Sequence, residues 1–177
     1  MKIFLLLSIL VTFSSMPLIS YGGESKSPVI CDKFELVTSI IGSTLRLSLD
    51  TDLPDDTVIS ITVNRSYWEK GNSSRYARPY FEQKSTVGKW RETQEIDINS
   101  SGWKQNLKNF QAEMEKATLG FKVERISKEI QVWIVVPIYG QTNTAFGKRN
   151  RNLEGKTVTT KSYGKLVEAE SLHTYPL

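Results

Sequence analysis

Aromatic and basic side chains interleave between Tyr67 and Arg91, and their chemistry is that of recognition. Aromatic rings with cationic neighbours stack on sugars and bases, and they anchor protein interfaces. We therefore expect a binding surface in which the rings anchor a partner and the cations orient it. The alternative is that half of the rings point into the core while the cations lie in water. The candidate binding residues of this segment are Tyr67, Trp68, Arg75, Tyr76, Arg78, Tyr80 and Trp90.

A second basic cluster lies in the polar stretch of residues 139–156 and adds Lys148, Arg149 and Arg151 to the candidate binding surface. Clustered cations can bind an acidic partner or anionic lipid headgroups. A solvated loop has the same composition, so that alternative stays open for this cluster.

Metal and nucleophilic chemistry have little support in the sequence. The chain contains one histidine, His173, and one cysteine, Cys31, too few for a zinc site of His and Cys ligands. A Ser–His or Cys–His pair would have to use His173, which we predict to lie in a C-terminal tail. Asp52, Asp55 and Asp56 lack the alternating spacing and the final Glu of a calcium loop. We expect no metal, no cofactor and no catalytic residue.

Carboxylates provide the one catalytic alternative that the composition leaves open. Glycoside hydrolysis uses two carboxyl groups that flank the bond to be cleaved. No spacing in the sequence selects two such groups, so a small secreted carboxylate-dependent glycan hydrolase is the second functional hypothesis. A structural subunit of a cell envelope is the third. The carboxylates on neighbouring segments are Glu69, Glu82, Glu92, Glu95 and Asp97.

The N-terminus has the pattern of a secretory signal peptide. Lys2 precedes an apolar run over residues 3–13, which is too short to span a bilayer, and Pro17 interrupts the segment that follows. Ser20 and Gly22 are small residues at the spacing that a cleavage site requires. The sequence therefore predicts an exported protein, periplasmic or secreted, without stable membrane insertion after cleavage.

This pattern divides the chain into three parts. Residues 1–22 form the predicted signal peptide, residues 23–32 a flexible leader, and residues 33–177 a single globular β-rich domain. Cys31 is the one cysteine, so it is either a small buried thiol or a link to another chain.

The charge of the chain is mild. Lys2 is the only charged residue among the first 22, so the remainder carries 22 Lys and Arg against 19 Asp and Glu. That balance does not demand a nucleic-acid partner. We expect a protein or glycan partner in a bacterial cell envelope, with the oligomeric state left open.

Alternation of apolar and polar residues predicts several short strands. Residues 44–50 and 58–63 alternate clearly, and the turn between them is rich in Pro and Asp, so they are predicted to pair as an antiparallel hairpin. Residues 64–78 are polar and are predicted to form a loop. Further strands are expected within 79–98, 121–136 and 157–172.

One amphipathic helix is predicted at about residues 101–118. Its apolar stripe repeats every three or four residues, which is typical of a helix face docked on a sheet. Ser100 or Ser101 is the expected N-cap, and Gly120 the expected end. The stripe consists of Trp103, Leu107, Phe110, Met114 and Ala117.

These elements predict a mainly β fold, an antiparallel β-sandwich that is immunoglobulin-like in outline and carries the helix in one crossover. An α+β roll, in which one helix packs on an antiparallel sheet, is the competing architecture. We expect an exported binding or accessory protein of the cell envelope, and not an enzyme, because catalytic groups are scarce beside the aromatic and basic residues.

Overall fold

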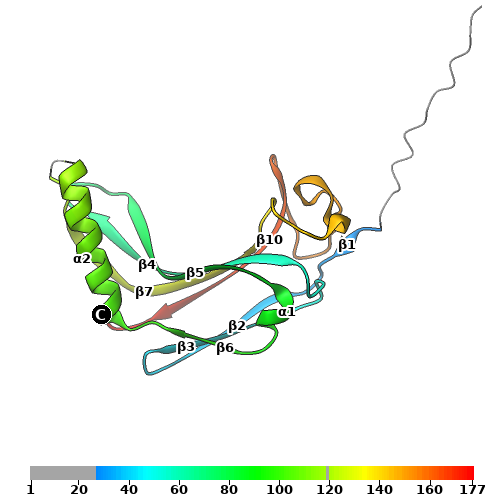
Figure 1. Ribbon diagram of the computed structural model, residues 1–177, viewed down its shortest axis with the longest axis horizontal. Helices are drawn as coiled ribbons and strands as arrows, with labels where there is room; N and C mark the ends of the chain where they lie inside the picture. The colour runs from blue at the N-terminus through cyan, green and yellow to red at the C-terminus, as the bar shows by residue number, and fades with distance from the viewer. Residues whose placement is uncertain (1–26, 119) are drawn as a thin grey trace, which may run out of the picture.

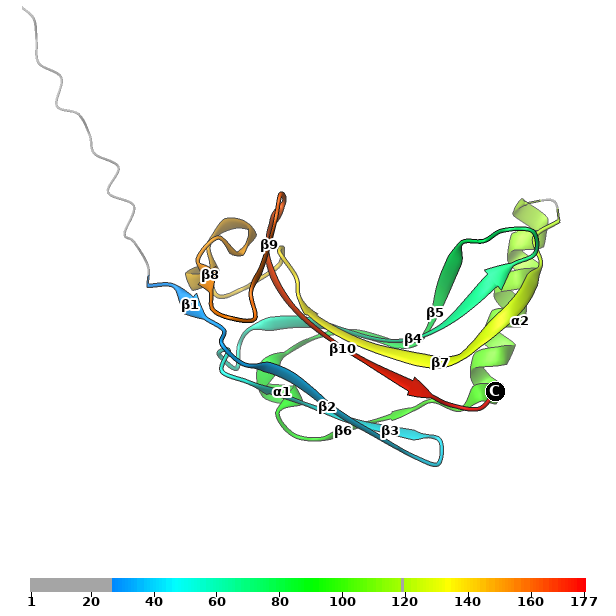
Figure 2. The same cartoon turned by 180° about the vertical axis from the view of Figure 1, so that it is seen from behind.

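Two antiparallel β-sheets face each other and enclose the main hydrophobic core (Figures 1 and 2). The structure, a computed structural model, describes residues 27–118 and 120–177. It contains 51% strand and 19% helix, which confirms the predicted mainly β fold with antiparallel sheets. The predicted signal peptide lies outside the described residues.

The larger sheet has five strands in the order β5-β4-β7-β10-β9 and curves strongly along its length (Figure 1). Each neighbouring pair in it is antiparallel. Its strands are β4 (Val58–Glu69), β5 (Arg75–Thr86), β7 (Val123–Val136), β9 (Thr159–Lys161) and β10 (Gly164–Thr174).

The smaller sheet has three strands in the order β2-β3-β6 and covers part of one face of the larger sheet. Its strands are β2 (Phe34–Ile41), β3 (Thr44–Thr51) and β6 (Gln94–Asp97). Alternate residues of both sheets are buried against each other, such as Leu47 of β3 and Ile61 of β4, each fully buried. Period-2 alternation therefore builds the core between the sheets.

Helix α2 (Ser100–Ala117) covers the rest of the same face of the larger sheet, beside the smaller sheet. Trp103 and Leu107 are buried there against Tyr67 and Phe121, which confirms the predicted docking of the apolar stripe. The helix connects β6 to β7 and so forms a crossover between the sheets. Its N-cap is Asn99, whose side chain accepts a hydrogen bond from the Ser101 amide at 2.9 Å.

The predicted hairpin of residues 44–50 with 58–63 is wrong, because β3 and β4 belong to opposite sheets. Both segments bury one face, but they bury it against each other across the core and not side by side. Periodicity identifies a buried face without identifying the neighbour in the sheet, and this is why the strands were found and their pairing was not.

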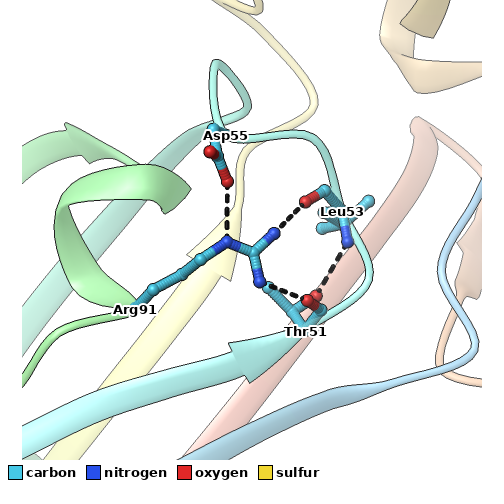
Figure 3. A network of polar contacts seen from close by, with 4 residues as sticks. All are labelled: Thr51, Leu53, Asp55 and Arg91. Atoms are coloured by element: carbon cyan, nitrogen blue, oxygen red, sulfur yellow. Dashed lines mark hydrogen bonds and ion pairs between the residues drawn. The ribbon is translucent and has the colours of Figure 1, made fainter.

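The connection between β3 and β4 is held by Arg91, which follows helix α1 (Val87–Trp90). Its guanidinium donates to Asp55 Oδ1 at 2.6 Å, to Thr51 O at 2.6 Å and to Leu53 O at 2.7 Å (Figure 3). The Leu53 amide donates in turn to Thr51 Oγ1 at 3.2 Å. Arg91 therefore fixes the path by which the chain passes from one sheet to the other.

Two further segments differ from their predictions. Residues 64–78, expected to be a loop, are mostly strand, since β4 continues to Glu69 and β5 begins at Arg75. Part of the expected flexible leader is built into the fold, because β1 (Val29–Ile30) pairs in parallel with β8 (Leu153–Glu154). Polar composition misled the first prediction, since this long hairpin leaves one of its faces in water.

The segment after β7 lies at the end of the molecule opposite α2 (Figures 1 and 2). It contains two short 3₁₀ helices, η1 (Thr144–Phe146) and η2 (Lys148–Asn150), and then β8. Among the helices of the described residues, none is long and apolar enough to cross a membrane.

Candidate binding surfaces at the two ends of the molecule

The structure separates the predicted binding residues into groups at opposite ends of the molecule (Figures 1 and 2). We call the α2 end the region of α2 and the β4–β5 hairpin beneath it. We call the β9–β10 end the region of the β9–β10 hairpin, η1 and η2. Trp68, Arg75, Tyr76, Arg78 and Tyr80 belong to the α2 end, and the cluster of Lys148, Arg149 and Arg151 belongs to the β9–β10 end.

Tyr67 and Trp90 are not surface residues, because each is only 4% exposed. Tyr67 packs beneath α2, and burial raises the pKa of its hydroxyl. Trp90 of α1 packs on Phe81 in the main core, with ring centroids 6.1 Å apart. For these two candidates, the alternative that rings point into the core is the correct one.

Tyr80 belongs to a cage around Arg65, an arginine that is fully buried. The Arg65 Nε donates to the Tyr80 hydroxyl at 2.8 Å, and the guanidinium carbon lies 5.7 Å from the Tyr80 ring centroid and 5.8 Å from that of Trp103. Burial raises the pKa of Tyr80, which keeps this hydroxyl protonated. Sequence reasoning missed Arg65 because residues 64–78 were predicted to form a loop, although the alternation of buried residues in β4 continues through this position.

The remaining bonds of Arg65 tie down the C-terminal segment. Its Nη1 donates to Ser127 O at 2.9 Å and to Tyr175 O at 3.1 Å, and its Nη2 donates to Pro176 O at 3.4 Å. No carboxylate among the described residues forms an ion pair with it. Carbonyl dipoles and aromatic faces therefore replace the counterion that a buried cation ordinarily requires.

Arg78 and Trp68 at the α2 end are also engaged in intramolecular contacts. The Arg78 guanidinium lies 4.2 Å from the Phe110 ring centroid of α2, and the Arg125 guanidinium lies 3.8 Å from the Trp68 ring centroid. These are cation–π contacts at short range. The cations and rings of this end largely satisfy each other.

Arg75 and Tyr76 lie further along the same hairpin. Arg75 Nε donates to Ser66 Oγ at 2.6 Å. Tyr76 is 37% exposed, stacks on Tyr67 at 5.5 Å between ring centroids, and accepts a hydrogen bond from Asn72 at 2.8 Å. Tyr76 is thus the most exposed of the predicted aromatic residues, and even it is held by its neighbours.

At the β9–β10 end, the structure brings the predicted cluster together with cations that the sequence reasoning did not select. Lys148, Arg149 and Arg151 line a hollow of about 270 Å³ with Lys161 and Lys165 of the hairpin. None of these five side chains forms an ion pair or hydrogen bond within the part of the chain that the structure describes. A sequence signal existed, since residues 139–165 contain six Lys and Arg and one acidic residue, Glu154.

Asn150 is buried beside this basic hollow and connects the segments that line it. It is 1% exposed, and its Nδ2 donates to Pro137 O at 3.0 Å and to Lys165 O at 3.1 Å, joining the end of β7 to the start of β10. Arg149 and Asn150 both adopt positive φ, 57° and 55°. The left-handed conformation costs a residue with a side chain roughly 1 kcal/mol, so the fold holds Arg149 in this strained position.

Gly164 allows the hairpin to approach η2. A Cβ at this position would lie 2.8 Å from the Arg149 carbonyl oxygen, and the glycine has a φ of 150°. A side chain there would force the hairpin away from the basic segment. The hollow is therefore formed by specific packing between two segments that are distant in sequence.

His173 lies in β10 and not in the predicted tail. Its Nε2 is 2.9 Å from Ser171 Oγ and 2.7 Å from Thr38 Oγ1 of β2, and burial lowers the pKa of the imidazole. In a serine hydrolase a carboxylate accepts a hydrogen bond from the histidine and orients it as the base. Among the described residues, no carboxylate forms a hydrogen bond with the His173 ring. The arrangement acts as a polar link between the two sheets.

Glu69 and Glu82, two carboxylates of the hydrolase hypothesis, are too far apart to act as a catalytic pair. Glu82 lies opposite Thr62 of β4, and Glu69 lies seven residues further along β4. At about 3.3 Å per residue these carboxylates are about 20 Å apart, beyond the roughly 10 Å limit of paired catalytic carboxyls. Glu95 forms an ion pair with Arg46 at 2.8 Å.

Metal ligands and the thiol can be placed as well. The described residues contain no group of three or more His, Cys, Asp and Glu arranged to hold a metal ion. Cys31 is fully buried and unpaired, accepts a hydrogen bond from Thr157 Oγ1 at 3.1 Å, and has a pKa that burial raises. It is the small buried thiol of the two alternatives that the sequence left open.

Comparison with known proteins adds no homologue to this picture: no protein-family model, no curated protein and no solved structure matches the chain.

Proposed function

We propose that this protein is an exported binding or accessory protein of a cell envelope, without catalytic activity, and that it binds an anionic partner at the basic hollow of the β9–β10 end. Acidic proteins and anionic glycans both have this chemistry. The proposal moves the binding surface away from the Tyr67–Arg91 segment, which the sequence favoured, because that segment's rings and cations largely pack on each other.

The observation that carries the proposal is the absence of internal partners for five neighbouring cations. Like charges that converge on one hollow repel each other, so their gathering costs stability unless a ligand offsets it. The fold also holds Arg149 in a left-handed conformation to build this hollow. Strain and uncompensated charge at one place are typical of a site shaped for a partner.

The test compares two matched pairs of Lys→Gln substitutions, which change the net charge equally. Lys148→Gln with Lys161→Gln removes cations from the hollow, whereas Lys108→Gln with Lys116→Gln removes exposed cations from α2. Binding is measured to heparin, an anionic glycan, and to polyglutamate, an acidic polypeptide. The first pair is expected to elute at lower salt than the wild type, and the second pair to elute with it.

Equal shifts for the two pairs would contradict the proposal, because binding would then follow net charge and not the hollow. Turnover of a cell-wall glycan by the wild type, lost in Glu69→Gln, Glu82→Gln or Glu92→Gln, would support the glycan hydrolase instead.

A further inference from the structure

An apolar hollow of about 360 Å³ adjoins the basic hollow on the outer face of the larger sheet. Trp133, Ile138 and Leu166 contribute to its lining. Lys161 and Tyr163 line both hollows, so the two share a rim. A site with a cationic half and an apolar half next to each other fits a ligand that is itself divided in this way.

Two tyrosine side chains near this end are more exposed than any aromatic residue at the α2 end. Tyr163, at the tip of the β9–β10 hairpin, is 49% exposed, and Tyr139, just after β7, is 59% exposed. Neither side chain makes a hydrogen bond within the described residues. Tyrosine has an apolar ring and a polar tip, and such side chains are enriched where an apolar phase meets water.

We infer that the anionic group bound at the basic hollow is the headgroup of a lipid, and that the β9–β10 end docks on an anionic lipid surface. This inference rests on the proposed function. Lys148, Arg151 and Lys161 face the phosphate groups, while Tyr163 and the adjoining apolar hollow contact the boundary between headgroups and acyl chains. A soluble glycan would use the basic hollow but would leave the apolar half of the site unfilled. An acidic protein with apolar side chains would fill both halves, so the comparison of vesicles with polyglutamate decides between lipid and protein.

Glu168 limits how deeply this end can dock. It lines the apolar hollow, and its carboxylate accepts a hydrogen bond from Trp133 Nε1 at 3.1 Å. A carboxylate is repelled by an anionic surface and is costly to remove from water. The sheet beyond Glu168 therefore stays in water, and the contact is confined to the hairpin tip and the hollow beside it.

The experiment measures co-sedimentation of the protein with two kinds of vesicle. The protein is used in the form in which expressing cells release it. One contains phosphatidylcholine alone, and the other contains phosphatidylcholine with phosphatidylglycerol. Binding is expected to require phosphatidylglycerol and to weaken as salt is added. Since each cation near such a surface increases partitioning about fivefold, Lys148→Gln with Lys161→Gln should reduce it about 25-fold.

A second substitution separates docking from simple charge attraction. Tyr163→Ser leaves the charge unchanged and should reduce partitioning severalfold, whereas Leu172→Ser, at a 54% exposed position of β10 far from the hairpin tip, should not. Lys108→Gln with Lys116→Gln is the charge control. All variants have the same N-terminus, so any contribution from the apolar run of residues 3–13 is common to them.

Three outcomes would overturn part of this account, and they can be told apart. Binding to heparin or polyglutamate through Lys148 and Lys161, with no preference for phosphatidylglycerol, would reject the lipid and keep the proposed function. Vesicle binding that needs these lysines but not Tyr163 would reject the docking arrangement. If Lys148→Gln with Lys161→Gln keeps wild-type binding to both the polyanions and the vesicles, both proposals are rejected.

Discussion

The α2 end and the β9–β10 end contain the same kinds of side chain and use them in opposite ways. At the α2 end, Arg65, Arg78 and Arg125 each lie over an aromatic ring, at distances between 3.8 and 5.8 Å. At the β9–β10 end, the five cations of the hollow have no partner among the described residues, and Tyr163 is exposed. Aromatic and basic residues thus hold the fold together in one region and face outward in the other.

This difference shows that composition does not separate structural from recognition residues. A cation–π pair inside the protein and one between protein and partner need the same residue types. What separates them is whether the partner ring or carbonyl comes from the same chain. At the α2 end the helix, the β4–β5 hairpin and the C-terminal segment supply these groups, and at the β9–β10 end no described segment does.

The largest expected effect comes from Arg65→Ala at the α2 end. The substitution removes a fully buried side chain and leaves Ser127 O, Tyr175 O and the Tyr80 hydroxyl without their donor. Because breaking a buried charged network is costly, the free energy of unfolding should fall by about 4 kcal/mol. Urea denaturation measures this change.

Arg65→Lys is the control for this prediction, because it keeps the charge but loses the planar fork of donors. It should recover part of the stability and not all of it. A free energy of unfolding for Arg65→Ala within about 1 kcal/mol of the wild type would show that the Arg65 cage is not what stabilises the α2 end.

Asn150 tests the strained support of the β9–β10 end. Asn150→Ala loses two hydrogen bonds of about 1 kcal/mol each and replaces an asparagine, which tolerates the left-handed region, by an alanine, which does not, for a total loss of about 3 kcal/mol. Asn150→Gly loses the hydrogen bonds but accommodates the positive φ, so its loss should be about 2 kcal/mol. Both variants are compared with the wild type by urea denaturation and by heparin binding.

The two Asn150 variants sharpen the comparison because they concern positioning and not charge. Heparin binding should weaken in both, since Arg149 and Lys165 lose their fixed positions while the net charge is unchanged. Wild-type heparin binding in both destabilised variants would mean that charge alone, without the built hollow, accounts for anion binding.

A direct comparison of one arginine from each end gives a smaller effect. Arg78→Met loses the contact with the Phe110 ring and should destabilise the protein by about 1 kcal/mol. Arg151→Met loses no internal partner and should change the free energy of unfolding by less than about 0.5 kcal/mol. Heparin binding should weaken more in Arg151→Met than in Arg78→Met. If one of these variants shows the larger loss both of stability and of heparin binding, the division between the ends is contradicted.

Much of the fold could be predicted from the sequence, since alternation and helical periodicity report on burial along single segments. The α2 stripe from Trp103 onward and the strands containing Leu47 and Ile61 were identified in this way. The pairing of β3 with β2 and β6 could not be, because pairing depends on which segments meet in space. The polar composition after Asn64 likewise concealed a strand that leaves one of its faces in water.

The candidate site was predicted less well, for the same reason. Lys148, Arg149 and Arg151 were selected because they are adjacent in sequence, and the structure places them on one hollow. Lys161 and Lys165 join them through the packing of Gly164 on Arg149 and the hydrogen bond from Asn150 to Lys165 O, which no local pattern reveals. Tyr67 and Trp90 were selected for their type, although burial decides their role.

The smallest expected effect is a pH dependence of stability through His173 on β10, the strand that runs from the β9–β10 end to the C-terminal segment held by Arg65. Burial lowers the pKa of His173 below its ordinary value of 6.5, so the unfolded chain takes up a proton at a higher pH than the folded one. Stability from this group is therefore complete above pH 6.5 and is lost as the pH falls below it.

Urea denaturation of the wild type and of His173→Gln, from about pH 7 to about pH 5.5, isolates this contribution, because all other titrating groups are common to both. The wild type should lose more stability than the variant on acidification. Heparin binding should stay constant over this range, since Lys and Arg remain charged and sulfate remains ionised. Parallel losses in the two proteins would mean that the burial of His173 does not favour the neutral imidazole. A fall in heparin binding would mean that the two ends are not independent.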